Sequence, residues 1–183
     1  MTMTYEIRMH GIGGQGVAAA ADLLGVAAVK DKRWAHSFPF FGTEIRGGVV
    51  TAYTRISDQP VRTRSFIYNP DLLVVFAGYL VTPETIQGLD EDSILLINNC
   101  PSLQGLPPIP CGHVTTIDGD EIASSIGGRV ANGPILGAIA ALTKQVSLAS
   151  LESAITERFP EEIARVTILG ARLGYERFIK KEG

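Results

Sequence analysis

Five residues close to the N-terminus, Gly11, Gly13, Gly14, Gln15 and Gly16, have the types and spacing of a loop that binds an anion. Glycine lacks a Cβ atom, so such a loop can turn tightly and bring its backbone close to a bound group. The N–H groups at the start of a following helix would then face outward, where they favour a negative charge. The alternative is a tight turn with nothing bound, because a lone G-x-G-x-x-G pattern is weak.

Two of these glycines are expected to respond differently to a larger side chain. At Gly13, a valine would block a close approach and would also strain a backbone with positive φ, at a cost of about 1–2 kcal/mol. At Gly14, we expect blocked approach alone.

Arg46, Gly47 and Gly48 form a second candidate site. The planar guanidinium can hold a phosphate or carboxylate through two parallel hydrogen bonds, and the glycines expose N–H groups. The alternative is a bend into a strand, with Arg46 paired to an acid across an interface. A third candidate, Asn132, precedes an expected helix and is interpreted either as its N-cap or as a polar contact to a neighbouring subunit or ligand.

The elements that must position these candidates follow from the hydrophobic pattern. Tyr5, Ile7 and Met9 alternate with polar residues, which predicts a strand, and the apolar run from Val17 to Lys30 predicts a buried helix. A second strand is expected from Trp34, and a hairpin from residues 49–56 paired with residues 61–68. Further strands are expected at residues 71–77, 93–98 and 113–117, and helices from Thr82, at 120–126, at 135–143, from Ser147 and at 161–180.

The whole chain, residues 1–183, is therefore interpreted as one α/β domain. We expect a Rossmann-like sheet that is mixed but mostly parallel, with helices on both faces and an inserted β-hairpin. Gly137 lies inside an expected helix, where it costs about 1 kcal/mol relative to alanine, so we expect close packing at this position.

Composition excludes several classes of function. A net charge of -3 argues against nucleic acid or an anionic membrane as partner. Cys100 and Cys111 lie in no C-x-x-C pair, so we expect neither a metal site nor an iron–sulfur cluster in this chain. The sequence starts without the pattern of a signal peptide and contains no apolar run of membrane-spanning length, so a cytoplasmic location is expected.

A free-standing Rossmann-like enzyme that uses a nucleotide is one alternative. A dinucleotide site usually has an acidic side chain at the end of the second strand, which binds the ribose hydroxyls. This chain has His36 and Ser37 there. That difference disfavours NAD, and binding of NAD or ATP by the isolated chain would revive the alternative. A regulatory ligand-binding module without an enzyme partner is the other alternative.

Aromatic residues gather in the second expected strand, at Trp34, Phe38, Phe40 and Phe41. They are interpreted either as core or as a surface that meets a partner, because aromatic side chains dominate the centres of interfaces.

Three motifs occur together in this chain: GIGGQG at residues 11–16, GTEIRGG at residues 42–48 and ANGPILG at residues 131–137. In this order and at this spacing, they make the chain resemble the gamma subunit, or gamma domain, of the 2-oxoacid:ferredoxin (acceptor) oxidoreductases. The resemblance covers nearly the whole sequence.

The resemblance implies a function within a multi-subunit enzyme. Such enzymes oxidatively decarboxylate pyruvate, 2-oxoglutarate or a branched-chain 2-oxoacid to an acyl-CoA and pass electrons to ferredoxin. Thiamine diphosphate with magnesium lies between alpha and beta partner subunits, and iron–sulfur clusters lie in the beta subunit and in a delta subunit where one is present.

For this chain, the resemblance implies a structural subunit beside the path of coenzyme A. We expect it to be inactive alone and to hold no cofactor stably, with coenzyme A as a shared ligand. The residues expected to bind such a ligand are Gly11, Gly13, Gly14, Gln15, Gly16, Arg46, Gly47, Gly48 and Asn132. For the glycine loop, the alternatives are a phosphate of coenzyme A, another anion such as an acidic side chain of a partner subunit, or a contact with the partner alone. Self-association of the isolated chain is left open.

Overall fold

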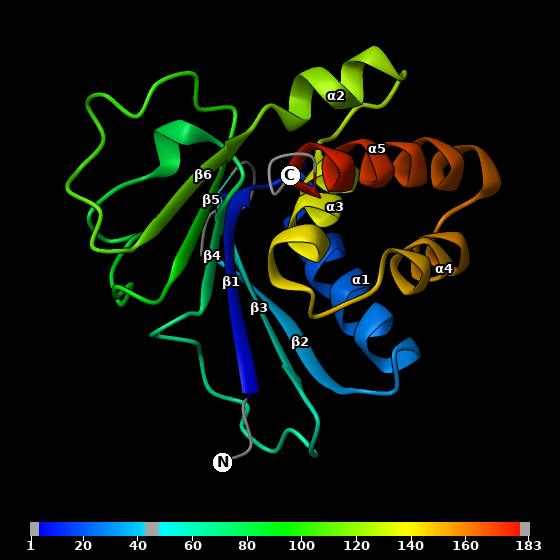
Figure 1. Cartoon of the computed structure of the whole chain (residues 1–183), viewed down its shortest axis with the longest axis horizontal. Coiled ribbons are helices and arrows are strands. Elements are labelled where there is room, and N and C mark those ends of the chain that lie inside the picture. Colours follow the sequence, from blue (N-terminus) through cyan, green and yellow to red (C-terminus); the bar gives the residue numbers. More distant parts are fainter. Residues whose placement is uncertain (1–3, 43–47, 180–183) are drawn as a thin grey trace.

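The computed structural model describes residues 4–42 and 48–179, which form a single sheet with helices packed against it (Figure 1). The strands are β1 (Thr4–Ile12), β2 (Trp34–Phe41), β3 (Val49–Ser57), β4 (Leu72–Val75), β5 (Ile94–Asn98) and β6 (His113–Ile117). Their order across the sheet is β2-β3-β1-β4-β5-β6. Among these six strands only β3 runs against the others, which confirms a mixed and mostly parallel sheet.

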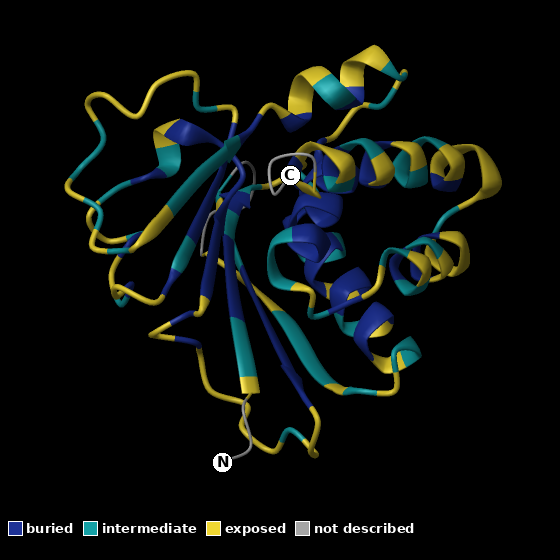
Figure 2. Cartoon of the chain, in the orientation of Figure 1, coloured by how far each residue is buried: buried dark blue, intermediate teal, exposed yellow. Residues whose placement is uncertain are grey.

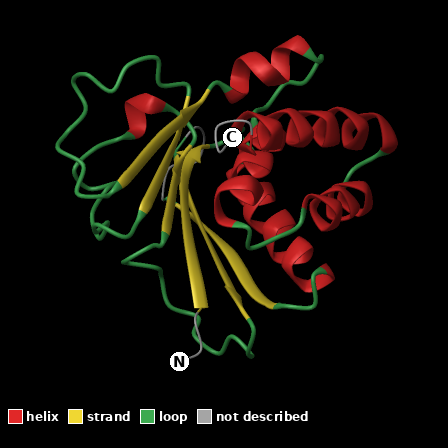
Figure 3. Cartoon of the chain, viewed as in Figure 1, coloured by secondary structure: helices red, strands yellow, loops and turns green. Residues whose placement is uncertain are grey.

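The described α-helices are α1 (Val17–Lys30), α2 (Gly119–Ser125), α3 (Asn132–Thr143), α4 (Leu148–Arg158) and α5 (Glu161–Ile179). The expected helices on both faces are wrong: these five gather on one side of the sheet (Figure 3). The opposite face, with Leu73 and Ile97, is covered by loop residues such as Ile86 and Leu89 and by the 3-10 turn η1 (Gly78–Leu80).

One reason for this difference is that the helix expected from Thr82 does not form. The Thr82 hydroxyl accepts a hydrogen bond from the Thr85 N–H (3.2 Å), as an N-cap does, but the segment continues only as turns. Gly88 adopts a φ of 87°, which no right-handed helix contains. The cap is therefore present, and the helix ends before it can propagate.

The hairpin is present, but with a different partner strand. β3 pairs antiparallel with β2 and β1, while residues 61–68 form no strand. The carbonyls of this segment face arginine side chains instead: Arg55 donates to Ser65 O (2.7 Å), and Arg8 donates to Tyr68 O (2.9 Å). Guanidinium groups thus satisfy backbone acceptors that a strand would have paired with another strand.

The core lies between the sheet and the helices, and α3 runs through its middle, buried on every side (Figure 2). Here α3 contacts α5 through glycines. A Cβ atom added to Gly137 would lie 1.9 Å from Ala171 O, and one added to Gly174 would lie 2.0 Å from Pro134 O. The expectation of close packing at Gly137 is confirmed. No helix in the described ranges is both long and apolar enough to span a membrane.

Candidate functional site

The glycine loop joins the carboxyl end of β1 to the start of α1, as the sequence predicts. The Gln15 side-chain oxygen accepts a hydrogen bond from the Ile12 N–H (2.9 Å), which closes the loop on itself. Gly11 leaves no room for a side chain, because an added Cβ would lie 2.5 Å from Val17 Cγ2. The loop is therefore a tightly built turn with its tip, Gly13 and Gly14, exposed.

Positive φ angles occur at Gly14 (96°) and Gly16 (81°), and not at Gly13. This reverses the expected contrast between Gly13 and Gly14. A side chain at Gly14 would find no atom within 4 Å but would strain the backbone. Sequence reasoning missed this because the pattern alone does not say which glycine turns the chain.

The start of a second helix meets the glycine loop. Gly16 is the N-cap of α1 and Ala131 is the N-cap of α3, and no side chain in the described residues caps either helix. A Cβ atom added to Gly16 would lie 3.2 Å from Asn132 Nδ2, so the two helix starts are adjacent. Both helices direct the positive end of their dipole to this edge of the sheet. At the start of α3, however, the Gly133 N–H already donates to Asn132 Oδ1 (2.9 Å), and Pro134 has no N–H.

Asn132 is buried, and it is the first residue of α3 rather than its N-cap. Its side-chain oxygen accepts from the Gly133 N–H (2.9 Å). The interpretation of Asn132 as the N-cap is therefore wrong by one position, because Ala131 already occupies the cap geometry. The side chain nevertheless lies against the glycine loop.

Gly48 also belongs to this edge, since its carbonyl accepts from the Gly13 N–H (3.1 Å). Arg46 and Gly47 lie outside the described residues. The structure thus brings together the loop at residues 11–16, Gly48 and Asn132, and leaves the other two candidates untested.

Three polar residues that the sequence analysis did not select line a hollow of about 120 Å³ beside Gly14: Asn98, Asp120 and Arg129. The Asn98 amide donates to Asp120 Oδ2 (3.1 Å) and to Phe76 O (3.0 Å). Arg129 is exposed and makes no ion pair with any described residue. A usable signal existed, because Asn98 is the last residue of β5 and Asp120 follows β6, and the carboxyl ends of these parallel strands meet at one edge.

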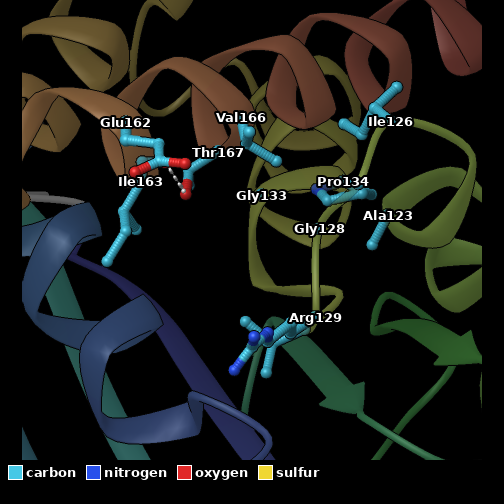
Figure 4. A pocket seen from close by; sticks show the side chains of 12 residues that line it. Ala123, Ile126, Gly128, Arg129, Gly133, Pro134, Glu162, Ile163, Val166 and Thr167 are labelled. Carbon is cyan, nitrogen blue, oxygen red and sulfur yellow. Dashed lines mark hydrogen bonds between the residues drawn. The ribbon is translucent and has the colours of Figure 1, made fainter.

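Figure 4 shows the residues that line a larger hollow of about 510 Å³. Its apolar walls come from α2, the start of α3 and the first turns of α5, at Ala123, Ile126, Val130, Pro134, Ile163 and Val166. Arg129 and Val130 line both hollows.

His10 contributes no positive charge to this edge. Burial, and then the nearby Arg8 guanidinium, lower the pKa of its imidazole to about 4. The ring is therefore neutral at pH 7. Within residues 4–42 and 48–179, no three His, Cys, Asp or Glu side chains lie close enough together to hold a metal ion. The described edge combines the start of α1 and the Arg129 guanidinium, which favour an anion, with the Asp120 carboxylate, which opposes one.

The aromatic residues of β2 form a separate surface on the face without helices. Phe38 stacks on Tyr53 of β3 (5.0 Å between ring centres), and Phe66 packs edge-on against Phe40 (5.1 Å). We call Trp34, Phe38, Phe40, Tyr53 and Phe66 the aromatic surface. Trp34 is 53% exposed and Phe40 is 48% exposed. Phe41, on the opposite face of the strand, is 62% exposed, so none of these three is a core residue.

Comparison with known proteins identifies the relatives of this chain. Residues 6–177 match the family model described as pyruvate ferredoxin/flavodoxin oxidoreductase. The chain is 41% identical over 177 residues to pyruvate synthase subunit PorC of Methanothermobacter thermautotrophicus, covering 96% of each chain. It is 39% identical over 178 residues to the pyruvate/ketoisovalerate oxidoreductases common subunit gamma of Pyrococcus abyssi, covering 94% of this chain and 96% of that protein.

Among solved structures, the chain resembles pyruvate oxidoreductase subunit PORC of Thermotoga maritima. The TM-score is 0.82 at 31% identity, and the match covers 94% of this chain and 96% of that chain. The likeness therefore extends over nearly the whole chain.

Proposed function

This chain belongs to the pyruvate ferredoxin/flavodoxin oxidoreductase family as a gamma subunit of a 2-oxoacid:ferredoxin oxidoreductase, and from that premise we propose that its glycine loop holds the phosphate end of coenzyme A. One observation carries the proposal. The starts of α1 and α3 meet beside the exposed Arg129, at the edge where parallel strands end. Ligands of open α/β sheets bind at such edges, and helix starts favour anions.

The remaining chemistry is assigned to partner subunits. We propose that alpha and beta subunits, with a delta subunit where one is present, supply thiamine diphosphate with magnesium and the iron–sulfur clusters, and that ferredoxin accepts the electrons. The proposed substrate is a 2-oxoacid of the pyruvate, 2-oxoglutarate or branched-chain type. Because these reactants are molecules of the cell interior, we place the complex in the cytoplasm.

The aromatic surface, together with Phe41, is the proposed contact with those partner subunits. Trp34, Phe40 and Phe66 of this surface expose apolar area to water, and burying that area on assembly is favourable. Arg62 and Arg64 lie exposed in the same loop as Phe66, so an acidic rim on the partner would complement this face.

The coenzyme A site is tested in the assembled enzyme with Arg129→Gln. Loss of a charge-assisted hydrogen bond costs about 1.5–3 kcal/mol, so the KM for coenzyme A should rise roughly tenfold to a hundredfold. Arg165→Gln removes an exposed arginine of α5 that lines neither hollow and should leave this KM unchanged.

Gly14→Ala provides a second measurement. It should raise the KM for coenzyme A and also destabilise the isolated chain by about 1 kcal/mol, because Gly14 has positive φ. If both variants keep the wild-type KM, coenzyme A does not bind at this edge. Tight binding of NAD or ATP by the isolated chain would instead favour a nucleotide-dependent function for the loop.

A further inference from the structure

The strand β2 lies at one end of the sheet, and its outer side is free. Among the described strands, only β3 pairs with it (Figure 1). The Gly42 N–H donates to Val49 O (3.3 Å), and bonded pairs alternate with non-bonded pairs along an antiparallel ladder. The even-numbered residues of β2 therefore direct their backbone groups to β3, and the odd-numbered residues direct theirs outward. The outward residues are Ala35, Ser37, Pro39 and Phe41.

This free edge lacks most of the features that keep edge strands from pairing. Such strands are usually short, charged or twisted by a bulge. β2 has eight residues, none of them Asp, Glu, Lys or Arg, and its pairing with β3 runs without a bulge from Trp34 to Phe41. Pro39 is the one protective feature, and it removes a single outward N–H. A long, uncharged edge of this kind is a site of association.

A hollow of about 230 Å³ lies beside the middle of the free edge. Ser37, Phe38 and Pro39 line it from β2, and Asp22 of α1 and Arg158 of α4 line it from the helices. The edge is therefore open to another strand at this point. The side chains of Asp22 and Arg158 are more than half exposed, and Arg158 Nε lies 3.6 Å from Asp22 Oδ2. An occupant of the edge would thus meet one negative and one positive group on the helix side.

We propose that the occupant is β2 of a second copy of this chain, so that two sheets join into one. A two-fold axis at the edge makes the two strands antiparallel. In the register that places Phe38 opposite Phe38 of the second copy, Ala35 and Phe41 exchange two hydrogen bonds at each end. Each Ser37 N–H also donates to Pro39 O across the axis, so six hydrogen bonds form. Any other two-fold register within residues 34–41 forms at most four, because Pro39 has no N–H and the overlap is shorter.

Side chains on both faces of the joined strands suit a second copy. Phe38 lies opposite its own counterpart, and aromatic pairs of this kind stabilise sheets. On the helix side, Asp22 and Arg158 line the hollow beside Phe38 and so lie near the axis, where each can meet the opposite charge of the second copy. The aromatic surfaces of both copies stay open to the partner subunits. The inference therefore does not depend on the coenzyme A site.

Sedimentation velocity of the isolated chain at concentrations up to about 100 μM tests this pairing, and we expect a dimer. Pro39→Ala supplies the missing outward N–H, which can donate to Ser37 O of the second copy, so the dimer Kd should fall by about tenfold. Ser37→Pro removes an outward N–H and should raise the dimer Kd by about tenfold or more. Ser37→Ala is the matched control, because it loses the same hydroxyl but keeps the N–H, and its dimer Kd should equal that of the wild type.

A cysteine at the axis tests the register. In a chain with Cys100→Ser and Cys111→Ser, Phe38→Cys places two thiols in a directly opposed pair with Cβ atoms about 4.5–5.5 Å apart. Oxidised glutathione should then produce a disulfide-linked dimer on a denaturing gel. Phe40→Cys is the control, because it lies opposite His36 of the second copy and roughly 14 Å along the strand from its own counterpart. It should give no linked dimer.

Three results would overturn the inference. The first is a monomeric wild-type chain at about 100 μM together with a monomeric Pro39→Ala variant. The second is a disulfide-linked dimer of Phe40→Cys in place of Phe38→Cys. The third is a monomeric chain whose Ser37→Pro variant keeps its circular dichroism spectrum but no longer co-purifies with partner subunits, which would show that a strand of a partner subunit covers the edge.

Discussion

Gly137→Ala should destabilise the chain even though alanine is the better helix former. An added Cβ would lie 1.9 Å from Ala171 O, 2.7 Å from Ala171 C and 2.8 Å from Tyr175 N, all of them backbone atoms of α5. Ordinary contact begins at 3.4 Å, so α3 and α5 would have to separate by about 1.5 Å. Overpacking of a core costs about 1–3 kcal/mol, and a contact this short belongs at the upper end of that range.

The gain in helix propensity offsets only about 1 kcal/mol of this cost. We therefore expect the free energy of unfolding to fall by about 2 kcal/mol, which corresponds to a Tm lower by roughly 4–8 °C for a chain of this size. Urea denaturation of the isolated chain, followed by circular dichroism, measures the first quantity, and thermal melts measure the second.

Gly25→Ala is the matched control within α1. Its added Cβ would lie 2.6 Å from the Ser37 hydroxyl oxygen, which belongs to a side chain that can rotate away. Rotation gives up the hydrogen bond from Ser37 to Thr54 Oγ1 (3.1 Å), at about 1 kcal/mol, and this roughly cancels the gain in helix propensity. A Gly137→Ala variant as stable as Gly25→Ala would refute the argument that backbone contact between α3 and α5 requires glycine.

The remaining predictions concern residues of β1 and β2. The pKa of His10 is lowered to about 4, so its contribution to stability is complete above pH 6.5 and is lost as the pH falls toward 4. Between pH 7 and pH 5, the free energy of unfolding should therefore drop by roughly 1–2 kcal/mol less in His10→Gln than in the wild type. The control variant His113→Gln, at an exposed position, should show the same drop as the wild type. Arg8→Met should lower the free energy of unfolding, measured in urea melts, by about 2–4 kcal/mol, because the Arg8 guanidinium donates to four backbone carbonyls. An unchanged urea midpoint would show that water satisfies these carbonyls equally well. Replacing Phe40 and Phe41 with serine should weaken co-purification with the partner subunits at least tenfold while the isolated chain still folds. Val29→Ser, at an exposed position on α1, is the control. If the double variant assembles as well as the wild type, these two residues do not belong to the interface.

Local patterns in the sequence were sufficient for most element boundaries. The helix predicted from Val17 to Lys30 has these same ends in the structure, and the helix predicted from Ser147 begins there, with the Ser147 hydroxyl accepting from the Ser150 N–H (3.1 Å). Such features depend on residues within one or two turns, so they can be recognised in the sequence. The strand–loop–helix arrangement around Gly11–Gly16 was predictable for the same reason.

The hairpin partner and the uneven covering of the sheet depended on contacts between distant residues. Residues 61–68 carry a strand-like pattern, but Arg8 and Arg55, which reach them from β1 and β3, occupy their carbonyls. Thr82 provides a cap, yet loops rather than a helix cover Leu73 and Ile97.

The candidate site also combines features that the sequence shows with features that only the fold shows. Its glycines could be found in the sequence, because their role is set by local backbone geometry. Asn98, Asp120 and Arg129 join Gly14 only because three parallel strands end at one edge of the sheet and α3 begins there. Strand order determines which loops become neighbours, and strand order is decided by the packing of the complete chain. The sequence by itself therefore determined the glycine loop between strand and helix, and the tertiary structure alone decided which side chains surround it.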